Sequence, residues 1–500
     1  MKTILKIFAL SLLATPVFAY SYQFQYLDQD ALRLTMSSLN GNARFVSMGG
    51  AFGALGGNLS ALSTNPASIG IYRSNEFSFT PALTIGQTET TPGDARSRQP
   101  MDLWNFNLGN FGLVSVWDVA KSDNPNEWKM LQFGVGLNRL ADFWNRSGYT
   151  RFASPWETYL DVLTNEANRT GRPLNPYYSG LAERADLIYF DSVDGAFFND
   201  LMWQDVNGDW QKPIGLTQRQ NTRTTGGINE WVFSFGGNYG DMLYLGATIG
   251  MPSVNFRQTK TLTEKNEGNA NPVFHEWRIR ENLEVSGLGI NLKLGAIYRP
   301  ADFVRLGLAI HTPTRYALKE KFSTEISGNT AFISNPGRVH TERGAWDYNI
   351  RTPMRLIGSV GFVIARQLLI GAEYEYVNYD RMRISDIDDS FEADNDFIAD
   401  NYRAGGTIRV GGEYRMDQVS LRLGYNYTMV PYADNLNRNF SGHSLSAGLG
   451  FITGSTTIDL AYVNTIRKFR MSPYPQMPND FYNHYSVTGH QFLVTFGWRF

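Results

Sequence analysis

The feature that most constrains the fold of this chain is a strict alternation of apolar and polar residues near its C-terminal end. Phe492, Val494 and Phe496 alternate with Gln491 and Thr495, and the last residue is Phe500. A period of two places successive side chains on opposite faces of an extended backbone. The segment is therefore predicted to be a β-strand with one apolar face.

The same alternation recurs along the chain, for example at 304–310 and 419–428. We predict about fourteen strands of roughly nine to seventeen residues, which is longer than most strands of soluble sheets and long enough to cross a bilayer at a tilt. The predicted strands cover residues 75–87, 101–118, 129–142, 229–239, 242–257, 283–299, 302–316, 352–365, 367–380, 402–415, 418–430, 442–453, 455–466 and 486–500.

The predicted connections alternate between tight turns and long polar loops. Tight turns fall at 239–241, 300–301, 366, 416–417 and 454–455. Short periplasmic turns and long outer loops are typical of outer-membrane barrels, and an even strand number places both chain ends on the periplasmic side. The sequence therefore predicts an all-β fold, a transmembrane antiparallel β-barrel over residues 75–500.

The N-terminus has the pattern of a secretory signal peptide. Two lysines precede an apolar run from Ile7 to Phe18, and the small residue Ala19 follows. The apolar run is too short to span a bilayer as a helix. We predict a cleaved signal peptide over residues 1–19, a mature chain beginning at Tyr20, and export to the outer membrane of a Gram-negative bacterium.

Composition excludes several classes of function. The chain has no cysteine, which rules out a disulfide framework, a thiolate metal site and a lipid anchor on cysteine. The formal net charge is -2 and the basic residues are scattered, so we expect no nucleic-acid partner. The high content of glycine and aromatic residues suits a barrel.

No constellation of residues indicates catalysis. The six histidines lack metal-ligand spacing, and no nucleophile elbow or phosphate-binding loop occurs. Residues 205–210 resemble the start of a calcium loop but lack its later ligands, so we predict a turn. The acidic run at 386–400 is predicted to be a solvated loop, with divalent-cation binding as the alternative. We expect no enzymatic activity, no cofactor and no metal.

The connection at 143–228 is too long for a simple loop. Ser154 and Pro155 are typical of a helix start, with Leu160, Leu163 and Ala167 on its apolar face, and a second helical segment is predicted at 178–189. We predict a partly helical cap outside the membrane, because long ordered loops are often functional. The alternative is a mobile loop.

Residues 20–74 precede the barrel and do not alternate. They contain MGGAFGALGG at 48–57 and SALSTNPASIG at 60–70. These motifs resemble the N-terminal plug of the FadL/TodX-type outer-membrane transporters of long-chain fatty acids and aromatic hydrocarbons, although Ser68 stands where the family usually has glycine. Two further stretches, 292–314 and 351–380, resemble strand pairs of the same family, so the resemblance covers most of the mature chain.

The resemblance implies a barrel closed by an N-terminal hatch at 20–74, a hydrophobic pocket, a lateral opening, and passive uptake of hydrophobic small molecules such as long-chain fatty acids. The alternative is a related barrel that serves as a scaffold for protein secretion or surface interaction. We expect a monomer whose partners are the hydrophobic ligand, outer-membrane lipids and lipopolysaccharide, and the barrel-assembly machinery that reads the terminal phenylalanine. The residues expected to contact ligand are Tyr20, Asn65, Pro66, Ala67, Arg305 and Arg422, and the hatch glycines are Gly49, Gly50, Gly53, Gly56 and Gly57. For the two arginines, pairing with a neighbouring glutamate is the alternative.

Overall fold

The structure is a computed structural model, and it describes most of the chain. The described residues are 27–92, 99–121, 126–153, 158–199, 201, 203–204, 210–211, 216–266, 274–330, 338–386, 391–429, 431–433, 441–471 and 482–500. The predicted signal peptide, Tyr20, the helix-start residues Ser154 and Pro155, and residues 205–209 lie outside them.

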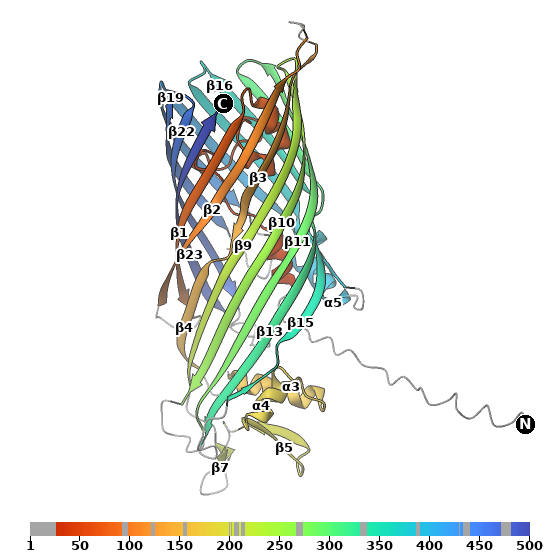
Figure 1. The fold of residues 1–500 in the computed structure, drawn as a ribbon. Helices are drawn as coiled ribbons and strands as arrows, with labels where there is room; N and C mark the ends of the chain where they lie inside the picture. The colour runs from red at the N-terminus through yellow and green to blue at the C-terminus, as the bar shows by residue number, and fades with distance from the viewer. Residues whose placement is uncertain are drawn as a thin grey trace, which may run out of the picture.

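A single antiparallel sheet closes on itself as a barrel of fourteen strands (Figure 1). Closure is made by the first and last strands, whose register runs from Glu76↔Arg499 to Thr91↔His484. The prediction of a fourteen-stranded transmembrane barrel is confirmed. Ten of its strands are continuous: β1(Glu76–Thr91), β2(Gln99–Asp118), β9(Leu216–Tyr239), β10(Leu243–Lys265), β11(Phe274–Ala301), β19(Ala404–Met416), β20(Val419–Thr428), β21(Gly442–Thr453), β22(Thr456–Met471) and β23(Asn483–Arg499).

Four strands of the barrel are interrupted, so nineteen segments make up the wall. The segments of each interrupted strand follow one another along the chain and pair with the same neighbouring strands. They are β3(Trp128–Asp142) with β4(Asn145–Ala153), β12(Val304–His311) with β13(Arg315–Thr330), β14(Arg338–His340) and β15(Gly344–Arg351) with β16(Arg355–Ile364), and β17(Leu368–Asn378) with β18(Arg383–Ser385).

The two ends of the barrel differ as predicted. Tight turns with left-handed residues, including Gly240, Arg366, Asp417 and Gly454, lie at the end that carries Phe500. The long connections and the insertion lie at the opposite end, which is at the bottom of Figure 1. We call these the inner and outer ends.

Several strands extend further toward the outer end than predicted. β9 begins at Leu216 rather than at residue 229. β10 continues to Lys265, and β11 begins at Phe274. Outside the membrane band the outward side chains become polar, so the apolar alternation that reveals a strand is lost while its hydrogen-bonded ladder continues. The insertion predicted at 143–228 is shorter for the same reason, because both of its ends are strand.

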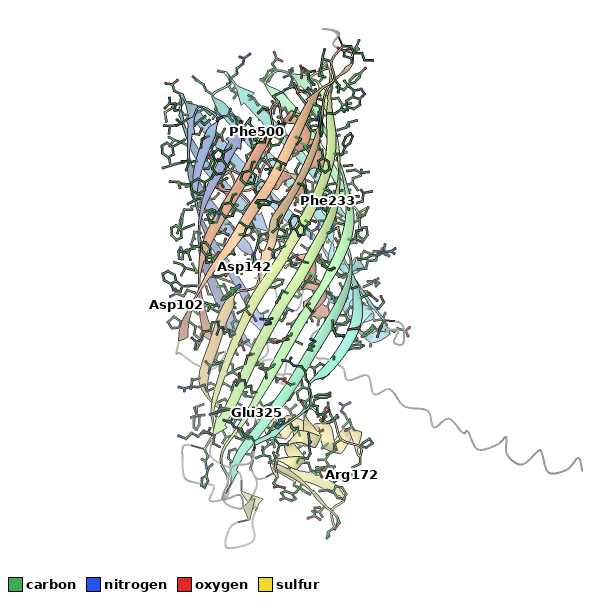
Figure 2. The ribbon with its side chains drawn as sticks, in the orientation of Figure 1. Asp102, Asp142, Arg172, Phe233, Glu325 and Phe500 are labelled. Atoms are coloured by element: carbon green, nitrogen blue, oxygen red, sulfur yellow. The ribbon has the colours of Figure 1, made fainter. Side chains whose placement is uncertain are left out.

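The wall carries an outward band of apolar side chains. On β11, for example, Leu288, Ile290, Leu292, Leu294 and Tyr298 are all exposed. Figure 2 shows such side chains projecting from the wall, with Phe233 among them, whereas Arg172 and Glu325 lie toward the outer end. This band is the surface that faces lipid acyl chains.

The N-terminal segment at 27–72, here called the plug, packs inside the barrel. It consists of the helices α1(Leu27–Thr35), α2(Ala43–Ser47), η1(Ser60–Ser63) and η2(Pro66–Ile71). Short polar side chains start two of them: Asn42 accepts from Phe45 N, and Asn65 accepts from Ala67 N. Ala43 N donates to Thr495 Oγ1 at 2.7 Å, which joins the plug to the last strand.

The insertion forms a small subdomain at the outer end. It contains α3(Tyr159–Thr170), α4(Ser179–Arg184), β5(Ile188–Asp191), β6(Ala196–Asn199), β7(Trp203–Gln204) and β8(Trp210–Gln211). The predicted helix start was wrong in position: Thr158 caps α3 by accepting from Asp161 N, so the helix begins at Tyr159. The predicted apolar face is buried as expected. The second helix ends at Arg184, because Ile188–Asp191 pairs with β6 instead.

Two shorter elements complete the outer half of the barrel. η3(Tyr379–Arg381) separates β17 from β18, and α5(Glu392–Asn401) follows. Part of the acidic run predicted as a loop is therefore helical. None of the helices in the described part of the chain is long and apolar enough to cross a membrane.

Candidate functional site

A collar of wall glycines surrounds the plug. On eleven successive strands of the barrel, a Cβ added to an inward-facing glycine would lie within 3.0 Å of a plug atom. These glycines are Gly112, Gly134, Gly236, Gly246, Gly295, Gly307, Gly361, Gly371, Gly411, Gly424 and Gly448. Because these positions have no side chain, backbone or side-chain atoms of the plug lie directly on the wall. The plug therefore contacts the wall closely on each of these strands.

The predicted ligand residues of the plug contact the collar. Asn65 is fully buried, and its Nδ2 donates to Gly53 O of the plug at 2.6 Å and to Ala296 O of β11 at 3.3 Å. Pro66 and Ala67 meet Gly246 and Gly295 of the wall. All three residues therefore fasten the plug to the barrel at this level.

The predicted hatch glycines lie in the turns of the plug. Gly49, Gly50, Gly56 and Gly57 have positive φ, which side chains rarely adopt, and Gly53 N donates to Glu373 Oε2 at 2.9 Å. Glycine is thus required here by backbone shape and by close contact with the wall.

A buried ionic cluster ties the plug to the wall near the inner end. Glu413 on β19 accepts from Arg44 Nε of the plug at 2.8 Å and from Arg422 Nε at 2.6 Å. It also pairs with Arg415 at 2.5 Å, and Arg422 donates to Asp459 Oδ1 at 2.6 Å. Breaking a buried pair leaves an uncompensated charge, so this cluster strongly favours the seated plug.

A second ionic cluster lies deeper in the lumen. Glu375 on β17 pairs with Arg355 at 2.6 Å and with Arg409, and Arg409 also pairs with Glu373 at 2.5 Å. Arg355 also donates to Thr35 O at the end of α1. The cluster therefore connects three wall strands to the plug.

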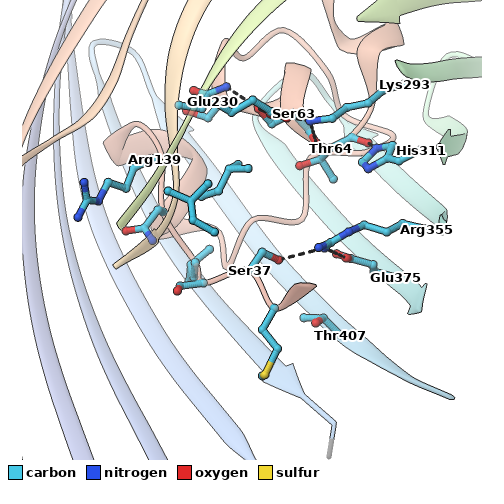
Figure 3. A pocket seen from close by; sticks show the side chains of 18 of the residues that line it. Ser37, Ser63, Thr64, Arg139, Glu230, Lys293, His311, Arg355, Glu375 and Thr407 are labelled. Carbon is cyan, nitrogen blue, oxygen red and sulfur yellow. Dashed lines mark hydrogen bonds and ion pairs between the residues drawn. The ribbon is translucent and has the colours of Figure 1, made fainter. Parts of the chain in front are cut away.

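The lumen holds a small polar cavity beside this second cluster (Figure 3). Its volume is about 100 Å³, against the roughly 300–1,000 Å³ of most small-molecule pockets. Figure 3 shows Lys293 paired with Glu230, and His311 against Thr64 O at 2.7 Å. Ser63 of the plug also donates to Glu230, at 2.7 Å. The charged side chains Lys293 and Glu230, and Arg355 and Glu375, in the lining of the cavity are thus paired with one another.

The two predicted arginines face the lumen, as expected from strand alternation. Arg422 is buried and pairs with two carboxylates, which is the alternative the sequence left open. Arg305 donates from one terminal nitrogen to Leu55 O of the plug at 2.6 Å. Both contact protein groups, and both stabilise the seated plug.

The outer half of the lumen is apolar and is filled by α1. Leu27, Ala31, Leu32 and Leu34 pack against an inner wall of large side chains. Those wall residues are Val254, Phe256, Val285, Tyr316, Leu318, Tyr348, Ile350, Val377, Tyr379, Met382 and Ile384. The helix α1 therefore occupies this apolar layer of the lumen.

One acidic residue of α1 lies within this apolar layer. Burial raises the pKa of the Asp30 carboxyl above its usual value, and the neighbouring Arg33 guanidinium opposes that rise. Tyr348 OH on β15 is 3.4 Å from Asp30 Oδ2. Asp30 thus contacts Arg33 in the next turn of α1 and Tyr348 of the wall.

A second hollow of about 130 Å³ lies between α1, the insertion and the outer ends of β10, β11 and β13. Its lining mixes Leu27, Tyr178 and Phe322 with Asp30 and Glu281. Tyr178 OH donates to Glu281 Oε1 at 3.0 Å across one side of it. This hollow opens at the outer end, on the side away from the collar.

Glu264 anchors the insertion to the barrel. Its carboxylate accepts from Tyr159 N of α3 at 2.8 Å, from Trp277 Nε1 at 2.6 Å and from Gln218 Nε2. The Tyr159 and Trp277 rings stack beside it, with centroids 6.3 Å apart. One buried carboxylate therefore joins the insertion to three barrel strands.

We predict that Glu264→Ala loosens the insertion. Three buried donors would lose their acceptor, and each unsatisfied group costs about 1–3 kcal/mol. Limited proteolysis of the folded protein should cut the insertion several-fold faster in this variant. Glu183→Ala, which removes only an exposed pair with Arg172, is the control. Equal cleavage rates in the two variants would contradict the anchoring role.

Sequence reasoning missed the acidic partners of the lumen. Glu230, Glu373, Glu375 and Glu413 lie on strands whose outward positions are apolar. The signal was present, since an acidic residue at an inward position of such a strand must find a cation when buried. Which cation it meets depends on the barrel register and on the seated plug.

Comparisons with known proteins place this fold. The family model described as BamG matches residues 209–461, half of the chain. A comparison with curated protein sequences gives no match. A Pseudomonas aeruginosa FadL homologue has a TM-score of 0.54 at 13% identity, covering 93% of this chain and 99% of that one. The P. putida toluene transporter TodX gives 0.52 at 12%, also over 93% and 99%.

A third solved structure, the CymD monoaromatic hydrocarbon channel, has a TM-score of 0.50 at 11% identity over 93% of this chain and 99% of that one. These likenesses show a common fold. The resemblance to FadL/TodX-type barrels drawn from the plug motif and the strand pairs is confirmed at that level.

Proposed function

The chain belongs to the BamG family and has the fold of outer-membrane channels, and from this premise we propose that it is a closed, non-enzymatic scaffold barrel that holds a partner protein at the cell surface. The observation that carries the proposal is the filled lumen. The plug lies directly on eleven strands, is joined to them by buried ion pairs, and places α1 in the apolar layer.

The filled lumen matters because a route for a hydrophobic molecule requires unoccupied apolar space. The hollows lined by described lumen residues include a polar cavity of about 100 Å³, a second one of about 90 Å³ beside Arg44 and Glu76, and a mixed hollow of about 130 Å³ at the outer end. Each is small for a hydrophobic ligand. Moving the plug would separate Arg44 from Glu413 and Arg355 from the end of α1. A barrel closed in this way suits a structural role.

The outer subdomain supplies a surface that suits a protein partner. The hairpin of β5 and β6 exposes Tyr189 and Phe190, and Val193 at its tip is 91% exposed. Arg172 lies near the Phe190 ring and presents further contact surface. Aromatic and arginine side chains are those most enriched at protein interfaces.

We predict that a photo-crosslinking amino acid at Val193 captures a protein partner in intact cells. The control position is Leu445, which is 64% exposed on the lipid-facing wall. A discrete protein adduct should form at position 193 and not at position 445, as judged by a mobility shift and mass spectrometry. Absence of any adduct at Val193, Phe190 and Tyr189 would count against the scaffold.

Uptake of hydrophobic small molecules, such as long-chain fatty acids, is the second candidate. Solved structures with this fold are hydrocarbon channels, and the wall has one break that suits lateral release. Within the described residues, β2 pairs with β3 only between Asn110 and Asp118, and β4 pairs with β9 and not with β2. Asn105 Nδ2 spans the break to Asp142 Oδ2 at 2.8 Å.

One measurement distinguishes the scaffold from the uptake channel. Cells lacking the protein, and cells carrying a form without residues 27–72, would be tested for uptake of radiolabelled oleate and toluene. The scaffold predicts unchanged uptake in the first strain. Loss of uptake there, restored by the intact chain, would favour the channel and place the ligand in the lumen.

A further inference from the structure

Three outward-facing arginines lie side by side on the wall toward the outer end. Arg315 on β13 is in register with Arg351 on β15, and Arg351 is in register with Arg383 on β18. Their chain neighbours Tyr316, Ile350 and Ile384 face the lumen, so the arginines point away from it. We call these residues the arginine row.

The row lies at the edge of the lipid-facing band. Arg315 is in register with Ile290 of β11, which belongs to the apolar band, and the outward residues beyond Leu288 become Ser286 and Glu284. On the strands that follow, Met354 and Tyr376 mark the same boundary. This edge is the one toward the outer end, where the outer leaflet has its head groups.

The row is unfavourable without an anion. Residues directly opposite on neighbouring strands have Cβ atoms about 5 Å apart, and like charges so placed destabilise a sheet. Within the described residues, Arg315 and Arg351 form no ion pair, and Arg383 donates to the backbone oxygens of Asp380 and Met382, each at 2.7 Å. Two acidic residues close to the row in the chain are paired with other cations: Asp347 pairs with Lys319 and Asp380 with Arg381, both at 3.4 Å.

An apolar hollow of about 470 Å³ adjoins the row on the outside of the barrel. Ile249, Ile290 and Leu292 line it together with Arg315 and Arg351. Aliphatic side chains beneath two guanidinium groups match a molecule with an anionic head and a hydrocarbon tail.

The Thr312-Pro313 step lines this hollow, and a second Thr-Pro step, Thr352-Pro353, is joined to it by hydrogen bonds. Pro313 separates β12 from β13, and Pro353 separates β15 from β16, since proline cannot donate to the ladder. Thr312 N donates to Leu292 O at 2.9 Å, and Thr314 N donates to Thr352 Oγ1 at 3.0 Å. These hydrogen bonds on either side of Pro313 hold the neighbouring strands together where the proline interrupts the ladder.

We propose that Arg315, Arg351 and Arg383 form a binding site for the phosphate of an acylated glycolipid of the outer leaflet, the lipid A part of lipopolysaccharide, with an acyl chain in the adjoining hollow. Guanidinium groups bind phosphate through paired, charge-assisted hydrogen bonds. The site is on the outside of the wall and is independent of whether the lumen carries a ligand.

The test measures lipid binding to the purified full-length protein by native mass spectrometry. The probes are diphosphorylated lipid A, phosphatidylglycerol and inorganic phosphate. In Arg315→Gln/Arg351→Gln/Arg383→Gln, we expect lipid A affinity to fall by at least about tenfold, because three charge-assisted contacts are removed. Millimolar inorganic phosphate should not displace lipid A from the unmodified protein, and phosphatidylglycerol should bind more weakly.

The matched control replaces three other outward arginines, Arg257, Arg278 and Arg338, which are paired with Glu284, Glu276 and Glu325. This triple variant loses the same charge but should keep its lipid A affinity. Heat-modifiable migration on gels verifies that both triple variants are folded. The single variant Arg351→Gln gives a second measurement of the loss of lipid A affinity. Equal loss in both triples, or equal binding of phosphatidylglycerol, would overturn the proposal.

Discussion

Glu413→Ala is expected to lower the free energy of unfolding by about 3–5 kcal/mol, the range for breaking a buried ion pair from one side. Glu413 accepts from Arg44 and Arg422 and pairs with Arg415. Its removal leaves three guanidinium groups near one another with Asp459 as the remaining acid of the cluster. The plug also loses the ion pair that Arg44 makes with the wall.

The measurement is a urea titration of the purified barrel in detergent micelles or vesicles, followed by tryptophan fluorescence. Glu284→Ala is the matched control, because Glu284 lies on a barrel strand and its ion pairs with Arg257 at 4.0 Å and Arg343 at 3.6 Å are on the exposed surface. Exposed pairs contribute about 0–1 kcal/mol. Similar losses in the two variants would show that the lumen cluster is solvated and does not hold the plug.

Gly424→Ala is expected to displace the plug, although it adds a single methyl group. An alanine Cβ at this position would overlap Gly49 N and the Met48 carbonyl carbon of the plug. Gly424 does not have positive φ, so the strand itself accepts alanine and the effect comes from contact alone. Overpacking of this kind costs roughly 1–3 kcal/mol.

Thiol labelling measures the displacement directly. The chain has no cysteine, so Ser63→Cys introduces a single thiol into the plug beside the lumen cavity. A membrane-impermeant maleimide added to folded protein should label this thiol about tenfold faster in the Gly424→Ala background, as expected for ~1.4 kcal/mol of opening.

Gly358→Ala is the control for this experiment. A Cβ at Gly358 on β16 would meet nothing within 4 Å, because this glycine faces outward. Labelling at the unmodified rate in Gly358→Ala and at a raised rate in Gly424→Ala would establish the collar. Equal rates in the two backgrounds would mean that the plug yields easily, and the scaffold proposal would lose its main support.

Much of the barrel was predictable from the sequence because its determinants are local. The alternation at 304–310 and 419–428 corresponds to β12 and β20, and the tight turns at 366, 416–417 and 454–455 lie between paired strands as predicted. A strand that faces lipid on one side and the lumen on the other shows this in its own residues. The plug motif likewise indicated the correct fold.

The outer ends of the strands were not predictable in this way. β9 and β10 continue past the apolar band, and their extra residues are mostly polar, with Leu216 and Leu262 among the exceptions. The bend at Thr312 and Pro313 also divided one predicted strand in two. Pairing between neighbouring strands determines where the strands end and where this strand is divided. A single sequence does not reveal which residues pair across strands.

The sequence by itself determined an all-β membrane barrel, its strand number, its inner turns and a compact segment before the first strand. Only the tertiary structure decided that the lumen is filled, since Arg44 and Glu413 meet across 369 residues of chain. It also showed that a glycine from each of eleven strands lies against the plug, and that three arginines form a row on the wall. The physical reason is that the register and stagger around a closed barrel determine which inward and outward side chains share a level.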